Sequence, residues 1–191
     1  PAPDDGPHLG PSLLPDLELV ATPFRGNFRG ATWNAQALFA RKVARHVAKA
    51  NYVNSLLTHR DFVTLAETHG SEGEGAALFL PKGFTSWWSP GTSSRAGVGL
   101  IVRDSFLAHF DAEQTQWVQV VRGRAAVLRL RGPRGSLDLW SVYFPTGSRH
   151  VLENPLRLQA LARQRQDMRM TVAAFIAPAA KVLSIISGDF N

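Results

Sequence analysis

Short apolar runs dominate the chain from Ala31 onward, and most of them have the length of a β-strand. Apolar segments of about four to eight residues bounded by Gly, Pro, Asn, Asp or Ser are typical of strands. Such segments occur at 31–34, 61–68, 76–80, 84–89, 97–102, 117–121, 125–130, 137–144 and 181–191. The turn sequence RGPRG between the runs at 125–130 and 137–144 predicts a hairpin.

Two longer segments have helical periodicity. Apolar residues recur at helical spacing between Gln36 and Leu57, and again between Asn154 and Ala177. Asn followed by Pro opens the second helix, because Asn caps the helix and Pro suits its first position. On the first helix the basic residues share another face, which we interpret as solvated: Lys42, Arg45 and Lys49.

The order of these elements predicts an α/β fold. A strand, a helix, several further strands and a final helix–strand pair favour a mixed sheet with both helices packed on one outer face. Residues 1–30 are rich in Pro, Gly and Asp, so we expect an extended N-terminal tail there, with the domain over residues 31–191.

Composition excludes several classes of protein. The absence of cysteine excludes a disulfide framework, a thiolate zinc site and a cysteine nucleophile. No apolar run reaches the roughly 20 residues of a membrane-spanning helix, so we expect no membrane span. The 45% hydrophobic content excludes a disordered chain, and a formal charge of +6 favours polyanionic partners such as nucleic acid.

Polar, oxygen-bearing residues end three of the predicted strands. Asn34 ends the first, Glu67 follows the second, and Asp189 and Asn191 end the last. Side chains at strand ends converge on one edge of a sheet. Two carboxylates and two amides are hard ligands that suit Mg²⁺ or Mn²⁺. The alternative is that each is an ordinary cap or turn residue.

Five segments in this order resemble the endonuclease/exonuclease/phosphatase superfamily, which includes abasic-site endonucleases, DNase I-like enzymes and the endonucleases of non-LTR retrotransposons. They are TWNAQALF (32–39), LAETHG (65–70), RAGVGLIV (95–102), LWSVYFPTG (139–147) and SGDFN (187–191). The resemblance covers Ala31 to Asn191 and extends to the N-terminal half of the family domain.

The resemblance implies a role for each candidate residue. Glu67 and Asn34 match the metal-binding positions, and Tyr143 matches the tyrosine that contacts the scissile phosphate. Asp189 matches the residue that orients or activates water, and Asn191 the one that holds the phosphate or leaving oxygen. The implied activity is Mg²⁺-dependent phosphodiester hydrolysis, with DNA as the expected partner of a nuclease.

The sequence departs from the family pattern at three places. Ala66 and Thr146 stand where many members have Gln and Asn, and the later Ser-Asp-His motif has no counterpart. None of the six histidines matches its phosphate-contacting His. His69, two residues after Glu67, is a possible substitute, but we interpret it as a solvated loop residue.

These departures lead to two expectations. The chain is expected to form only the first half of a four-layer α/β sandwich, with the partner sheet missing. Its inner face would then be an apolar patch of Val98, Leu100, Leu137, Leu139 and 183–186, covered by chain beyond Asn191 or by a protein partner. We therefore expect the chain alone to be inactive; the alternative function is an interaction or structural subunit with an incomplete catalytic edge.

Arginines cluster along the predicted hairpin at positions 122, 124, 129, 131 and 134. They suggest either a ridge that follows phosphates or a solvated edge strand that blocks aggregation.

Overall fold

The computed structural model describes residues 22–39, 43–73, 78, 80–92, 95–147, 153–176 and 181–190. The strands in these ranges are β1 (Gly30–Asn34), β2 (Phe62–Ala66), β3 (Phe84–Ser89), β4 (Val98–Arg103), β5 (Gln116–Val121), β6 (Ala125–Gly132), β7 (Gly135–Tyr143) and β8 (Leu183–Asp189). The helical elements are α1 (Val43–Leu57), α2 (Asp104–Leu107), η2 (Ala112–Gln114) and α4 (Pro155–Ile176). Within the described ranges, no helix has both the length and the apolar character that crossing a bilayer requires.

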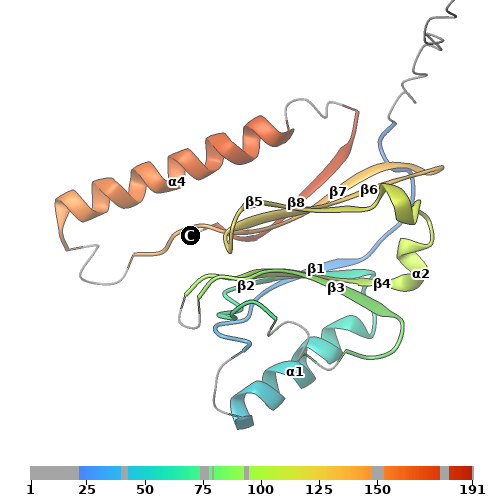
Figure 1. Cartoon of the computed structure of the whole chain (residues 1–191), viewed down its shortest axis with the longest axis horizontal. Coiled ribbons are helices and arrows are strands. Elements are labelled where there is room, and N and C mark those ends of the chain that lie inside the picture. Colours follow the sequence, from blue (N-terminus) through green and yellow to red (C-terminus); the bar gives the residue numbers. More distant parts are fainter. Residues whose placement is uncertain are drawn as a thin grey trace, which may run out of the picture.

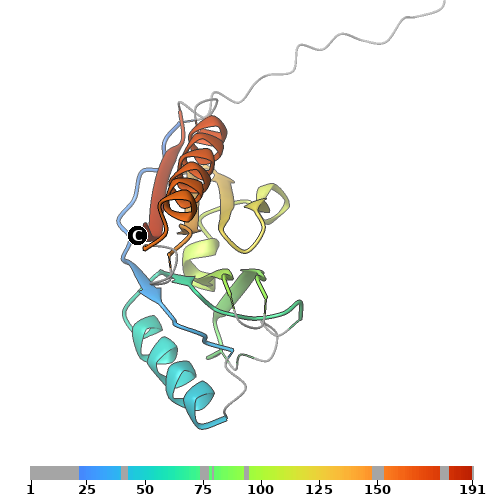
Figure 2. The same cartoon turned by 90° about the vertical axis from the view of Figure 1, so that its left-hand side faces the viewer.

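The strands form two four-stranded sheets that pack face to face, with orders β1-β2-β4-β3 and β5-β6-β7-β8 (Figure 1). β1 pairs with β2 and β7 pairs with β8 in parallel, while the remaining pairs are antiparallel. Helix α1 lies outside the first sheet and α4 outside the second, as both views show (Figures 1 and 2). The predicted α/β class is confirmed, and the two sheets with their outer helices form the four-layer sandwich of which we expected only the first half.

The prediction of a single sheet with both helices on one face is wrong. Apolar runs identify strands but do not say which sheet each strand joins. After β4, the short elements α2 and η2 carry the chain across to β5, and the second sheet begins there. The partner sheet that we expected to be missing is therefore formed by β5–β8 of this chain.

The apolar face expected to need an external partner is largely buried between the two sheets. Leu100 from the first sheet and Leu137 and Leu139 from the second have no exposed surface and belong to one core cluster. Fully burying side chains of this size contributes about 1.5–3 kcal/mol each. The inter-sheet core is therefore supplied by the chain's own strands.

Each long helix buries one stripe on its sheet. Val53 and Leu57 of α1 pack with Val63 and Ile101, and Met168 of α4 packs with Trp140 of the second sheet. The N-terminus of α4 is as predicted, because the side-chain oxygen of Asn154 accepts a hydrogen bond of 3.1 Å from the backbone N–H of Arg157.

Two predicted elements differ from the structure. Residues 35–39 form a turn, so the helix expected from Gln36 begins only later; residues 40–42 lie outside the described ranges. In the run at 76–80, Leu78 and Leu80 are described and neither belongs to a strand.

Residues 22–29, the described part of the predicted tail, pack on the domain. The backbone N–H groups of Phe24 and Arg25 donate 2.9 Å hydrogen bonds to the carbonyls of Ser136 and Arg134. Gly135 has φ +105°, and a Cβ there would lie 2.5 Å from the Pro23 carbonyl oxygen, so this close approach requires glycine. Residues 1–21 lie outside the described ranges.

Candidate active site

The C-terminal ends of β1, β2, β7 and β8 lie at one edge of the sandwich. Asn34 at the end of β1 pairs with Ala66 of β2, the residue before Glu67. Tyr143 at the end of β7 pairs with Asp189 of β8. Parallel pairing within each sheet brings the strand ends together, and the two sheets meet at this edge. The site thus takes residues from both sheets.

A hydrogen bond between side chains connects the two sheets at this edge. Asn34 Nδ2 donates to Asp189 Oδ2 at 2.7 Å, across 155 positions of sequence. Asn34 Oδ1 accepts a 3.1 Å bond from the backbone N–H of Gln36, which fixes the orientation of the amide. Asn34 therefore holds the Asp189 carboxylate in one position.

Hydroxyl groups join the two sheets behind the site. The hydroxyls of Thr64 on β2 and Ser187 on β8 lie 2.8 Å apart. Ser141 of β7 donates to the Leu65 carbonyl at 3.1 Å, and both Thr64 and Ser141 have no exposed surface. Buried hydroxyls need partners, and these find them across the interface. These hydroxyl contacts were not predicted from the sequence; their signal there is a Ser or Thr at an inward position of each strand.

The loops around the site contain left-handed residues other than glycine. Among the described residues, φ is positive at Gln36, Ala37, Glu67, His69 and Ala96, with values of 43° to 70°. Such residues cost of order 1–3 kcal/mol and cluster at functional sites. Backbone bonds hold the two loops together, including Ala37 N–H to the Glu67 carbonyl at 2.7 Å.

Lys49 of α1 holds the loop that follows β1. Its ammonium donates to the carbonyls of Ala35 at 2.8 Å, of Ala37 at 3.2 Å and of Gln36 between them. The interpretation of Lys49 as part of a solvated face is therefore wrong. Because these three carbonyls accept hydrogen bonds from Lys49, residues 35–37 form a loop and do not extend α1 toward its N-terminus. Burial and Arg45 lower the pKa of Lys49, and Glu67 opposes this shift.

Glu67 and His69 lie side by side and are mostly covered. His69 Nε2 is 3.9 Å from Glu67 Oε2, and the two side chains are 20% and 18% exposed. The interpretation of His69 as a solvated loop residue is wrong. Burial lowers the pKa of His69; Glu67 raises it, whereas Lys49 and Arg124 lower it. The net direction favours a neutral imidazole.

Tyr143 lies between Thr146 and Arg124. Its hydroxyl is 3.0 Å from Thr146 Oγ1, and the Arg124 guanidinium carbon is 4.5 Å from the ring centroid. Burial raises the pKa of Tyr143, the bond to Thr146 lowers it, and Glu67 raises it further. The phenol thus stays protonated at neutral pH, with its hydroxyl in hydrogen-bond contact with Thr146 and Glu67.

The donors at this edge fit a sparse Mg²⁺ site. The Glu67 carboxylate and Asn34 Oδ1, which keeps a second lone pair, are hard oxygen donors. The described part of the chain contains no group of three or more His, Cys, Asp or Glu residues suited to a metal. Mg²⁺ usually needs only one or two protein carboxylates and keeps several waters. Asn191 lies outside the described residues.

The hairpin arginines have separate surroundings. β6 is an inner strand, so the edge-strand interpretation is wrong. Arg131 Nη1 donates to Asp138 Oδ1 at 2.7 Å, and Asp138 is 1% exposed, so this pair compensates a buried charge. Exposed Arg122 pairs with Glu72 at 3.3 Å. Only Arg124 of these three lies beside Tyr143.

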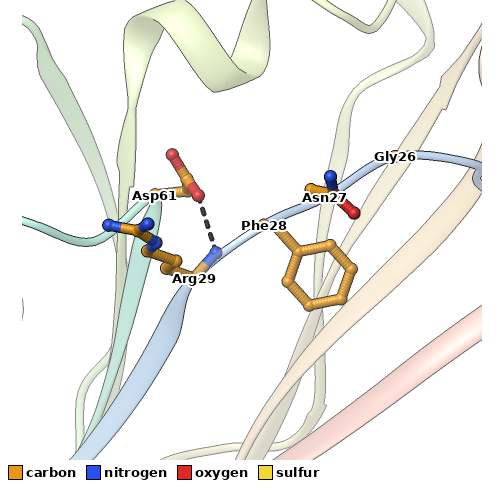
Figure 3. A pocket seen from close by; sticks show the side chains of 5 residues that line it. All are labelled: Gly26, Asn27, Phe28, Arg29 and Asp61. Carbon is orange, nitrogen blue, oxygen red and sulfur yellow. Dashed lines mark hydrogen bonds between the residues drawn. The ribbon is translucent and has the colours of Figure 1, made fainter.

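A separate pocket of about 550 Å³ lies at the other end of β2 (Figure 3). Gly26, Asn27, Phe28, Arg29 and Asp61 line it. The Asp61 carboxylate accepts a 2.7 Å bond from the Arg29 backbone N–H, so its role there is to hold the N-terminal segment. None of the predicted site residues lines this pocket.

Comparison with known proteins identifies the fold. No protein-family model and no curated protein sequence matches this chain. Among solved structures, the chain is similar to AP endonuclease LMAP from Leishmania major, with a TM-score of 0.62, 17% identity and 88% of this chain covered. Truncated Caenorhabditis elegans TDP2 matches with a TM-score of 0.56, 18% identity and 86% coverage.

The 3′ phosphatase NExo from Neisseria, in a variant form bound to a product DNA hairpin, matches with a TM-score of 0.53 and 15% identity over 79% of this chain. The chain spans 60%, 62% and 53% of the lengths of the three proteins, respectively. All three belong to the endonuclease/exonuclease/phosphatase superfamily. The predicted resemblance is therefore confirmed as a likeness of fold.

Proposed function

We propose that the parent domain of this chain is a Mg²⁺-dependent phosphodiesterase that acts on DNA, of the abasic-site or retrotransposon endonuclease type. The observation that carries the proposal is the 2.7 Å bond from Asn34 to Asp189, which joins the two sheets at the edge shared with Glu67 and Tyr143. The structural neighbours that process DNA support hydrolysis of phosphate esters in general.

Each residue at this edge has a role that its geometry allows. Asp189, oriented by Asn34, accepts the proton of the attacking water. Tyr143, protonated at neutral pH, donates a hydrogen bond to a phosphate oxygen. Glu67 and Asn34 Oδ1 would hold Mg²⁺, which when bound stabilises the charge that develops on the phosphate oxygens.

Metal binding by residues 1–191 tests this proposal directly. Titration with Mn²⁺, followed by electron paramagnetic resonance, is expected to show a site that Glu67→Gln weakens at least about tenfold, because a coordinating charge is lost. The matched control is Glu72→Gln, which changes an exposed carboxylate on the same loop. Equal Mn²⁺ binding by wild type and Glu67→Gln would refute the assignment.

We also propose that residues 1–191 do not cleave DNA by themselves. No histidine here matches the one that contacts phosphate in the resembled family, and loss of one positioned group commonly costs about 10²–10⁴-fold in rate. A plasmid-nicking and abasic-oligonucleotide assay in Mg²⁺ checks this, with Asp189→Ala as the control. Robust turnover that Asp189→Ala abolishes would show that these residues are catalytically complete.

A second candidate is an interaction or structural subunit. It is favoured by an apolar groove of about 280 Å³ between α4 and the edge strand β8, lined in part by Phe144, Ile186 and Phe190. Ile186 and Phe190 are 41% and 48% exposed. If this is the only function, Mn²⁺ binding will be absent, and Glu67→Gln will change nothing that the titration measures.

A further inference from the structure

The outer face of β6 carries a polar pocket that the proposed function does not use. Its volume is about 280 Å³, and residues of η2, β5 and β6 line it: Glu113, Gln114, Gln116, Arg129 and Arg131. The candidate site lies at the opposite end of β6, where Ala125 pairs with Val142. The pocket is therefore separate from the proposed chemistry.

Two arginines of this pocket face a single buried carboxylate. Arg129 is the register partner of Asp138 on β7, yet the Asp138 carboxylate pairs with Arg131 at 2.7 Å. Nη1 of Arg131 also donates to the carbonyls of Leu130 and Leu137. Because Asp138 is 1% exposed, its pairing with Arg131 is fixed by the core, and no ion pair within the described ranges includes Arg129.

The Arg129 guanidinium has an unsatisfied donor. Its Nε is buried and has no hydrogen-bond partner among the described residues. The Phe175 ring of α4, whose centroid is 5.6 Å from the guanidinium carbon, offers no acceptor for the in-plane N–H groups. A buried donor without an acceptor is costly, and a guanidinium bonds most strongly to an anionic oxygen. Arg129 thus lacks a carboxylate or a similar oxyanion.

The carboxylates at the rim of the pocket do not fill this role. Glu113 lines the pocket and is exposed, and Asp111 accepts a 3.0 Å bond from Gln114 Nε2. Neither forms an ion pair with Arg129 in the part of the chain that the structure describes. Their charges repel an incoming anion, so removing one of them should strengthen its binding.

The N-terminal segment of the chain carries the complementary charge. Residues 1–21 contain four acidic residues, Asp4, Asp5, Asp16 and Glu18, and neither Lys nor Arg. Asp16 and Glu18 alternate with Leu17 and Leu19, a spacing that puts both carboxylates on one face of an extended chain.

The described residues next to this segment are attached close to the pocket. The Thr22 carbonyl accepts a 2.7 Å bond from the backbone N–H of Ser136, whose register partner on β6 is Arg131. Neighbouring strands lie about 4.8 Å apart, so Thr22 is about 10 Å from the backbone of Arg131. A chain spans up to about 3.3 Å per residue, so Glu18 and Asp16 can lie about 13 Å and 20 Å from Thr22. Both lengths suffice to bring a carboxylate to Arg129.

We propose that Arg129 binds a carboxylate of Asp16 or Glu18, which docks the acidic N-terminal segment on the outer face of the second sheet. The segment crosses the β6–β7 hairpin and supplies the oxyanion that the buried Nε of Arg129 lacks. This inference is independent of the proposed function, because the pocket shares no residue with the candidate active site.

A nitroxide on the segment tests the docking in the full chain of 191 residues. The chain has no cysteine, so Ser12→Cys carries a single label. Docking should broaden the amide NMR signals of Gln114 and Gln116. Arg129→Met should lower the ratio of docked to free segment about three- to tenfold, since one charge-assisted pair is lost. Glu113→Gln should raise this ratio.

Matched variants separate a direct contact from a general disturbance. Arg122→Met, which removes an exposed arginine of the same hairpin, should leave the broadening unchanged. Asp16→Asn with Glu18→Gln alters only the segment and should weaken docking as Arg129→Met does, whereas Asp4→Asn with Asp5→Asn should not. Combining Arg129→Met with the Asp16 and Glu18 changes should add no further loss, because both remove the same pair.

Three outcomes would overturn the inference. The first is broadening that is absent, or that neutralising Asp16 and Glu18 leaves intact. The second is broadening in a mixture of nitroxide-labelled chain and unlabelled ¹⁵N chain, which would assign the pocket to a second copy. The third is a segment that stays free while a single-stranded oligonucleotide shifts the Gln116 signal only when Arg129 is present, which would assign the pocket to nucleic-acid phosphate.

Discussion

The two ends of the sandwich differ in the side chains they carry: one end is apolar and aromatic, and the other is polar and charged. Where β2 begins, five phenylalanines pack together, with ring centroids 5.1–6.3 Å apart: Phe24, Phe28, Phe62, Phe106 and Phe110. Where β2 ends, the edge carries Glu67, left-handed loops and the bond between Asn34 and Asp189. The five-residue strand β2 thus runs from the apolar end of the sandwich to the polar end.

The two ends therefore differ in what they contribute: the phenylalanine end to stability, and the polar end to the candidate site. Aromatic pairs contribute about 0.5–1.5 kcal/mol beyond their burial, so the phenylalanine end stabilises the fold. The polar end contains left-handed residues and partly buried charges, each of which lowers stability. Substitutions at one end should therefore change the free energy of unfolding, and substitutions at the other should change ligand binding.

The largest expected effect on stability lies at the phenylalanine end. Phe106 is 3% exposed and contacts Phe24, Phe28 and Phe110. Phe106→Ala should lower the free energy of unfolding by about 3–5 kcal/mol, because it leaves a cavity in the core. Urea denaturation measures this, with exposed Phe190→Ala as the control. If both variants lose the same stability, the two ends do not differ as described.

A smaller effect is expected where the polar end is held by α1. Lys49→Met removes the ammonium that binds the carbonyls of Ala35, Gln36 and Ala37. Gln36 and Ala37 are at least partly exposed, whereas Ala35 is buried and its carbonyl would lose this partner, so the loss should be about 1–2 kcal/mol in unfolding free energy. Because the loop also positions Asn34, Mn²⁺ binding should weaken too. Arg45→Met, one turn earlier on the same helix, should leave metal binding intact.

The sequence predicted which polar residues lie at the strand ends, but not which residues of other segments contact that edge. Asn34, Glu67 and Asp189 could be identified because each ends or follows an apolar run, and the structure brings Asn34 and Asp189 into contact. Tyr143 was identified only through the family resemblance. What the sequence did not predict depends on distant partners. Lys49 has the pattern of a solvated helix face, and only the folded loop shows its carbonyl partners.

The assignment of strands to the two sheets also depended on contacts between distant segments, which the sequence pattern does not specify. Leu100 and Leu137 have the pattern of inward-facing residues, but that pattern does not specify which strands cover them. Only the crossing after β4 places their strands in facing sheets. Local apolar patterns thus predict elements and buried faces, while long-range topology determines which faces meet.

The smallest expected effect concerns the protonation of Tyr143 at the polar end. Burial raises the pKa of Tyr143 above 10.0, so its phenol ionises later in the folded chain than in the unfolded one. As pH rises through 10, the unfolded state loses this proton while the folded state keeps it, and the free energy of unfolding falls. Below pH 10 both states are protonated, so the residue contributes no slope there. Tyr143→Phe should remove this part of the decline above pH 10, measured by urea denaturation at stepped pH.

Tyr52 is the other tyrosine of the chain, so Tyr52→Phe leaves a single phenol, Tyr143, whose ionisation can be followed by absorbance near 295 nm. A midpoint below 10 in that variant would show that burial does not raise the pKa of Tyr143, and Tyr143 would then contribute nothing to the decline in stability above pH 10.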